Sequence, residues 1–178
     1  MTPINYNFPS LYEGDTFSGI SVTARQSEQA QFSITSINRT GNVATAVTSV
    51  AHGLVNSNIV KVTGANEVGY NKASAITVID DTSFSFAVEN EPASPATGEI
   101  KGQRLIPIDL TNVGIKMDIR QSETAKSYLK RFTEESGITK TDAVNGVFKI
   151  NAFIVDFPAT NYVYDLQFTY NSGAVATY

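Results

Sequence analysis

Few side chains in this 178-residue chain could take part in catalysis, because the chain contains one histidine and no cysteine. A serine triad or a multi-histidine metal centre would depend on His52 alone, and disulfides and thiolate sites are excluded. His52 is followed by Gly53 and Leu54 at the end of a β-type run, where an imidazole ring can hydrogen-bond the backbone of the turn. We therefore interpret His52 as a structural residue.

The carboxylates are not spaced as a catalytic pair or as a metal site. Asp80 and Asp81 are adjacent, so their side chains would point to opposite faces of an extended chain, and a tight turn over residues 80–83 explains both. Together with Asp142 they could in principle hold calcium, but acidic residues do not recur at ligand spacing. Glycine-rich phosphate-binding motifs are also missing. We expect a protein that is not an enzyme and that binds no metal or cofactor.

Tyrosines gather in residues 146–170, where two β-type runs are separated by a turn-like segment at 156–161. This pattern predicts a hairpin, with residues 114–121 as its partner strand. One face of the second run carries only large apolar or aromatic side chains: Tyr162, Tyr164, Leu166, Phe168 and Tyr170. The tyrosines could stack on sugar rings, but because they share this face with Leu166 and Phe168 we expect most of them in the core.

The composition excludes several partners. The chain has 13 Lys and Arg against 17 Asp and Glu, so no basic surface is predicted for nucleic acid or for anionic lipid. No apolar run approaches the roughly 20 residues that span a bilayer, and the first ten residues lack the pattern of a signal peptide. We expect synthesis in a cytoplasm and no contact with a membrane.

Residues 1–13 form a separate N-terminal arm. Pro3 and Pro9 prevent a helix, yet the arm carries apolar side chains that favour burial. The arm either packs on its own domain or docks on a neighbouring subunit. The candidate docking residues are Ile4, Tyr6, Phe8, Leu11 and Tyr12.

The remaining chain predicts two β domains, one inserted into the other. Residues 34–102 contain short Val, Thr and Ala runs with turn residues every eight to twelve positions, which is typical of a small all-β unit. The expected strand at residues 99–101 could pair with residues 34–37 and close that unit. Residues 14–33 and 103–178 then form one discontinuous β domain, since an insertion is tolerated where a loop brings its ends together.

Within the discontinuous domain, Ile115, Met117 and Ile119 alternate with charged residues and predict a half-buried strand. Residues 122–136 are ambiguous. A helix is possible because apolar side chains recur at helical spacing after Ser122, and a strand over residues 128–133 competes with it.

The discontinuous domain resembles an immunoglobulin-like sandwich module of tailed-phage structural proteins, such as the N-terminal module of baseplate upper proteins. The resemblance rests on residues 14–17 (GDTF), 108–120 (IDLTNVGIKMDIR), 137–150 (GITKTDAVNGVFKI) and 164–168 (YDLQF). It implies an immunoglobulin-like β-sandwich and a strand at residues 128–133.

The inserted domain is similar to a small β module of phage virion proteins and some bacterial surface proteins. The matching segments are residues 44–54 (ATAVTSVAHGL), 59–65 (IVKVTGA), 69–72 (GYNK) and 76–86 (ITVIDDTSFSF). Lys72 stands where that module usually has glycine, so the turn after Asn71 differs.

Together the two resemblances imply a multi-copy virion structural protein whose partners are major capsid or tail proteins. An auxiliary or decoration protein of the capsid is the main expectation, because tail adaptors with this module usually carry long C-terminal extensions. A tail or baseplate adaptor is the first alternative. A receptor-recognition module that binds a host surface glycan is the second.

Overall fold

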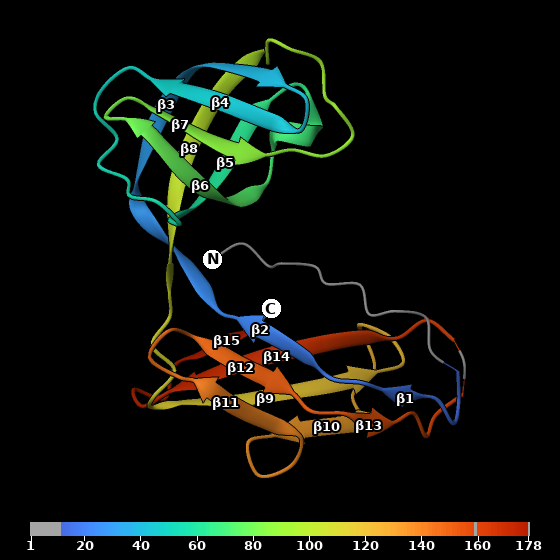
Figure 1. Cartoon of the computed structure of the whole chain (residues 1–178). Coiled ribbons are helices and arrows are strands. Elements are labelled where there is room, and N and C mark those ends of the chain that lie inside the picture. The colour runs from blue at the N-terminus through green and yellow to red at the C-terminus, as the bar shows by residue number, and fades with distance from the viewer. Residues whose placement is uncertain (1–11, 159, 178) are drawn as a thin grey trace. The chain divides into compact units, whose positions relative to one another are not determined.

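The computed structural model describes residues 12–158 and 160–177. These residues contain β-strands, one short 3-10 turn η1 (Val68–Tyr70) and no α-helix, which confirms the predicted all-β class. None of the described helical segments is long and apolar enough to cross a membrane. The chain divides into two compact units (Figure 1). We name them the sandwich unit, up to Arg25 and from Pro107 onward, and the barrel unit, residues 26–106.

The barrel unit is a closed antiparallel barrel with the strand order β3-β4-β7-β6-β5-β8 (Figure 1). Its strands are β3 (Arg25–Thr40), β4 (Val43–Thr48), β5 (Ile59–Ala65), β6 (Ala73–Asp80), β7 (Ser83–Ala87) and β8 (Gly98–Pro107). Because β8 lies beside β3, the first and last strands of the insertion are neighbours, as expected. Closure removes the free edges that an open sheet would leave.

The interior of the barrel is filled by alternate residues of its strands. Val60 and Val62 of β5 and Phe84 and Phe86 of β7 are buried there. Tyr70 of η1 is also fully buried, and its hydroxyl donates to the Ala93 carbonyl at 3.0 Å, which satisfies the polar end of the ring.

The barrel strands extend beyond the boundaries expected for the insertion. We expected residues 34–102, whereas the compact unit spans residues 26–106 because both β3 and β8 are longer than their apolar segments. The first half of β3 reads QSEQAQ over residues 26–31, so it lacks the apolar alternation that marks a strand in a sequence.

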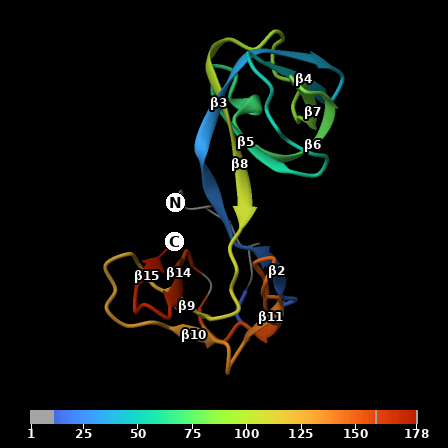
Figure 2. The same ribbon diagram turned by 90° about the vertical axis from the view of Figure 1, so that its left-hand side faces the viewer.

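The sandwich unit consists of a four-stranded sheet, β10-β9-β14-β15, a three-stranded sheet, β11-β12-β2, and the short pair β1-β13. The strands are β1 (Thr16–Phe17), β2 (Ile20–Thr23), β9 (Val113–Arg120), β10 (Lys130–Thr133), β11 (Ile138–Asp142), β12 (Val147–Ile150), β13 (Phe153–Ile154), β14 (Val163–Tyr170) and β15 (Val175–Thr177). Figure 2 shows the sheets of β9 and β14 and of β2 and β11 as two layers. Met117, Phe132, Phe148 and Ile150 pack between them. The sandwich architecture is thus present, while its immunoglobulin-like assignment stays a prediction.

The predicted hairpin over residues 146–170 is wrong. Its first run is β12, which pairs with β11 and β2, and its second run is β14, which pairs with β9 and β15. The two runs lie in different sheets and meet face to face, with the rings of Phe148 and Phe168 5.9 Å apart. Each run therefore covers the apolar face of the other across the core. The expected partner strand over residues 114–121 is present as β9, and it pairs with the second run alone, since Tyr164 lies opposite Ile119.

The backbone decides the ambiguous segment and shows one further irregularity. Residues 122–136 contain the strand β10 and no helix, because Phe132 is needed in the sandwich core. The first strand of the domain is split at Gly19, which has a positive φ of 85°, and its halves β1 and β2 pair with β13 and β12.

Candidate functional site

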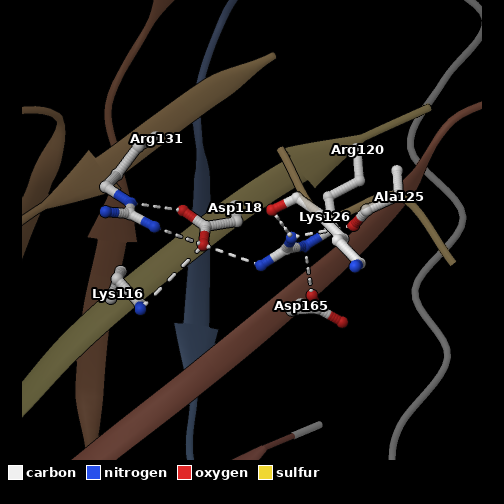
Figure 3. Close-up of polar contacts among 7 residues, drawn as sticks. All are labelled: Lys116, Asp118, Arg120, Ala125, Lys126, Arg131 and Asp165. Atoms are coloured by element: carbon white, nitrogen blue, oxygen red, sulfur yellow. Dashed lines mark hydrogen bonds and ion pairs between the residues drawn. The ribbon is translucent and has the colours of Figure 1, made fainter. Parts of the chain in front are cut away.

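A charged cluster lies on the outer face of the four-stranded sheet (Figure 3). Along β9 the residues alternate, so that Ile115 and Met117 enter the core and Lys116, Asp118 and Arg120 lie on the opposite face. Strand register adds two further groups, because Arg131 of β10 and Asp165 of β14 both lie opposite Asp118. Three strands thus bring charged side chains of both signs together.

Asp118 is the centre of this cluster and is 0 % exposed. Arg131 donates to both of its carboxylate oxygens, from Nε to Oδ1 at 2.6 Å and from Nη2 to Oδ2 at 2.9 Å. Arg120 donates from Nη2 to Oδ2 at 3.2 Å and from Nε to Asp165 Oδ2 at 2.7 Å. The Nζ atom of Lys116 lies 3.9 Å from Oδ2. The buried carboxylate is therefore fully partnered, in the two-pronged geometry that makes Arg–carboxylate pairs strong.

The cluster keeps Asp118 ionised. The hydrogen bonds from Arg131 lower the pKa of Asp118 below its ordinary value, and the positive charges of Arg131, Lys116 and Arg120 act in the same direction against the effect of burial. The same hydrogen bonds raise the pKa of Arg131. A carboxylate that is held ionised has no proton to donate near neutral pH, and both oxygens of Asp118 already accept from arginine. The cluster therefore braces the sheet by linking β10, β9 and β14.

The brace also holds the loop that connects β9 to β10. Arg120 donates from Nη1 to the carbonyl of Ala125 at 3.1 Å and to that of Lys126 at 3.4 Å (Figure 3). The guanidinium of Arg131 lies over the ring of Tyr128, 4.0 Å from its centroid. Residues 121–129 are thereby tied to the sheet at both of the arginines that bind Asp118.

This loop forms one wall of a surface hollow with a volume of about 410 Å³. The hollow is lined by residues 121–124, which directly follow β9, and by residues 161–163, which lead into β14. The two segments lie side by side because Val163 is the strand partner of Arg120. The hollow is thus located at one end of the sheet, beside the Asp118 brace.

Tyr162 lines this hollow, whereas the other tyrosines of the predicted aromatic face do not. Tyr164 and Tyr170 pack against the core as half-buried residues together with Leu166, and Phe168 is buried. Tyr162 precedes β14 and donates its hydroxyl proton to the Pro158 carbonyl. The expectation of a core position therefore holds for the strand residues, and Tyr162 departs from it because the strand begins one residue later.

His52 has the structural role predicted for it. The backbone N–H of Leu54 donates to His52 Nδ1 at 3.0 Å, so the ring carries its proton on Nε2, which lies 3.4 Å from the Ser83 carbonyl oxygen. The ring also packs edge-on against Phe84 with the centroids 5.6 Å apart. Both ring nitrogens are engaged with the backbone of the barrel.

Replacing His52 by alanine should lower the free energy of unfolding of the barrel unit by about 1–2 kcal/mol, because the Leu54 N–H loses its acceptor. His52→Asn is the matched control, since an Asn side chain can accept from the N–H two residues on. We expect it to cost less than His52→Ala in urea denaturation. Equal losses in the two variants would show that the hydrogen bond from Leu54 is not what the ring contributes.

Asp80 and Asp142 also have structural roles, in turns. Asp80 Oδ1 accepts from the backbone N–H of Thr82 at 2.8 Å, which confirms the tight turn between β6 and β7. Asp142 accepts from the Asn145 side chain at 2.9 Å in the turn before β12. Within residues 12–158 and 160–177, no group of three or more His, Asp or Glu residues could hold a metal ion.

The candidate docking residues of the arm are mostly outside the described part of the chain. Ile4, Tyr6, Phe8 and Leu11 fall on positions that the structure does not describe, and Tyr12 is 69 % exposed. The Asp118 brace, by contrast, was not predicted. Lys116, Asp118 and Arg120 alternate with apolar residues as solvent-facing charges would, and Arg131 is 13 positions away from Asp118.

Comparison with known proteins assigns no family to the chain. No protein-family model matches it, and no curated protein matches its sequence.

Proposed function

We propose that this chain is a non-enzymatic structural protein of a bacteriophage virion and acts as an auxiliary or decoration protein of the capsid. The proposal starts from the resemblance of its two β domains to virion modules. It is supported by what the matching residues do in the structure, which is to brace the fold.

Polar motif residues that carry the resemblance are engaged in hydrogen bonds and ion pairs within the fold. In the matching segment 108–120, Asp109 accepts from the Thr111 backbone at 2.9 Å and from its hydroxyl at 2.6 Å, and Asp118 is the centre of the ion-pair cluster. In the barrel unit, His52 holds the turn that follows it. The observation that carries the proposal is that these polar groups stabilise the fold. A structural protein of a virion acts through its surface, so its internal polar groups are expected to have this role.

Localisation on purified particles tests the proposal. We expect mass spectrometry to find the chain in particles purified to homogeneity, and cryo-EM to place many copies on the capsid lattice. A few copies at the tail end would instead indicate a tail or baseplate adaptor. Absence of the chain from purified particles would refute a virion role altogether.

A deletion variant tests the docking role of the arm in the same experiment. Particles assembled with a chain that lacks residues 1–13 should contain fewer copies, while the variant unfolds at the same urea concentration as the full chain. Unchanged incorporation would exclude the arm as the docking element. A lowered unfolding midpoint would show that the arm packs on its own domain.

A further inference from the structure

We propose that the hollow lined by residues 121–124 and 161–163 binds a neutral sugar ring stacked on Tyr162. The hollow is shallow and largely open to solvent, with a volume of about 410 Å³, so a ligand would contact it with one face only. Its lining combines an aromatic ring with amide, carboxylate and hydroxyl groups from Gln121, Glu123, Asn161 and neighbouring residues. Sugars present an apolar C–H face and a rim of hydroxyls, so a stacking ring beside such polar groups matches both parts of the ligand.

Tyr162 is fixed before any ligand arrives. Its hydroxyl donates to the Pro158 carbonyl, and its ring packs against Phe157 with the centroids 5.0 Å apart and the planes at 85°. In an edge-to-face pair of this kind each ring uses either an edge or one face, so Phe157 covers at most one face of Tyr162, which is half-buried and lines the hollow. A ring held at both its hydroxyl and its side loses little conformational entropy when a ligand stacks on it.

The polar groups around the ring are available to a ligand. Gln121, Glu123 and Asn161 are exposed, and their side chains make no hydrogen bond or ion pair with any described residue. Amides can donate and accept, while a carboxylate accepts from two hydroxyls at once. Adjacent hydroxyls of one sugar ring would find complementary partners on both walls of the hollow.

The charge of the lining selects neutral sugars. Glu123 is the one charged side chain among the residues that line the hollow. Arg120, which directly precedes residue 121, is committed through Nε, Nη1 and Nη2 to Asp165, to loop carbonyls and to Asp118. Since no cationic side chain is among the lining residues, an anionic sugar would meet Glu123 without a positive partner in the lining, which disfavours its binding.

Titration of the full chain with small sugars, followed by ¹⁵N–¹H NMR, tests the site. The probes are cellobiose, lactose and N,N′-diacetylchitobiose, with lactose that carries a terminal sialic acid as the anionic comparison. We expect at least one neutral probe to shift the backbone amides of residues 121–124 and 161–163, with a dissociation constant of about 1 mM. The sialylated probe should bind no more tightly than lactose.

Variants separate the stacking ring from its surroundings. Tyr162→Ala should weaken binding about tenfold or more, whereas Tyr162→Phe should stay within about threefold because the ring is kept. Tyr12→Ala removes an aromatic side chain that is 69 % exposed elsewhere, so it should not change the affinity. Asn161→Ala and Glu123→Gln alter exposed groups without described partners, so they should fold normally and weaken binding by about threefold each.

The proposal is overturned if no neutral probe shifts these amides, or if Tyr162→Ala and Asn161→Ala both bind as the native chain does. Tighter binding of the sialylated probe would overturn the assignment of neutral ligands. The proposed sugar site is independent of the virion role. Tyr162→Ala should therefore leave particle incorporation unchanged. The two proposals can therefore fail separately.

Discussion

Replacing Asp118 by alanine should lower the free energy of unfolding of the sandwich unit by about 3 kcal/mol. The buried carboxylate satisfies Arg131 and Arg120 together, so its removal leaves the Arg131 guanidinium without its carboxylate partner and takes one of several partners from Arg120. Breaking a buried ion pair typically costs about 3–5 kcal/mol. We expect the low end of that range because the Arg131 side chain is 37 % exposed and regains water. Urea denaturation monitored by NMR signals of each unit would measure the loss.

Asp165→Asn is the matched control on the neighbouring strand. Asp165 binds the same Arg120 at 2.7 Å, but its side chain is 36 % exposed, so the change should cost less than about 1 kcal/mol. If Asp118→Ala destabilised the unit no more than Asp165→Asn does, the brace would not depend on the buried carboxylate.

The effect of Asp118 should also depend on pH. Its pKa is lowered in the folded chain, so its contribution is fully present above the unfolded value of about 4 and is lost as the pH falls through the folded value. The stability difference between the native chain and Asp118→Asn should therefore be constant from pH 7 to pH 5 and shrink below about pH 4. A difference that grows on acidification would contradict the assigned direction of the pKa shift.

Gly146→Ala should destabilise the sandwich unit by about 3 kcal/mol or more. Gly146 has a φ of +73°, and an added Cβ would lie 2.6 Å from the Ala24 carbonyl oxygen and 2.8 Å from that of Ile108. Backbone strain at positive φ and overpacking each cost about 1–3 kcal/mol. These contacts are with backbone, which cannot move aside without breaking the bond from the Ala24 N–H to the Gly146 carbonyl at 2.8 Å.

Gly173→Ala separates the two causes. Gly173 lies in the same unit with a φ of +80°, but an added Cβ would meet nothing within 4 Å. The free energy of unfolding that Gly173→Ala loses should thus reflect the conformational strain alone, about 1 kcal/mol. Equal unfolding midpoints for the two variants would show that the contact with Ala24 and Ile108 contributes nothing.

Local patterns predicted the parts of the fold that depend on one strand at a time. The alternation of Ile115, Met117 and Ile119 identified β9, and the aromatic alternation after Tyr162 identified β14. The turn at Asp80 and the backbone role of His52 also follow from nearby residues. Each of these features is fixed by the chain within a few positions, which is what a periodic pattern measures.

Features that depend on distant segments were not predictable in this way. An apolar face indicates only that another element packs on it. The pattern therefore could not distinguish a β12 that packs on β14 across the core from a β12 that pairs with β14 in one sheet. In the sequence a buried Asp118 has the same alternating pattern as a solvent-exposed one, and only the strand pairing with Arg131 distinguishes the two. The position of Tyr162 in a hollow likewise depends on the loop at residues 121–124, which no residue near Tyr162 specifies.

The backbone hydrogen bonds around Gly146 also hold the point at which the second domain is inserted. Ala24 and Ile108, at the two points where the chain leaves and re-enters the sandwich unit, are themselves joined by a hydrogen bond from the Ile108 N–H to the Ala24 carbonyl at 3.0 Å. A scaffold that holds both ends of an insertion in register accepts a different domain at that point without a change in its own core.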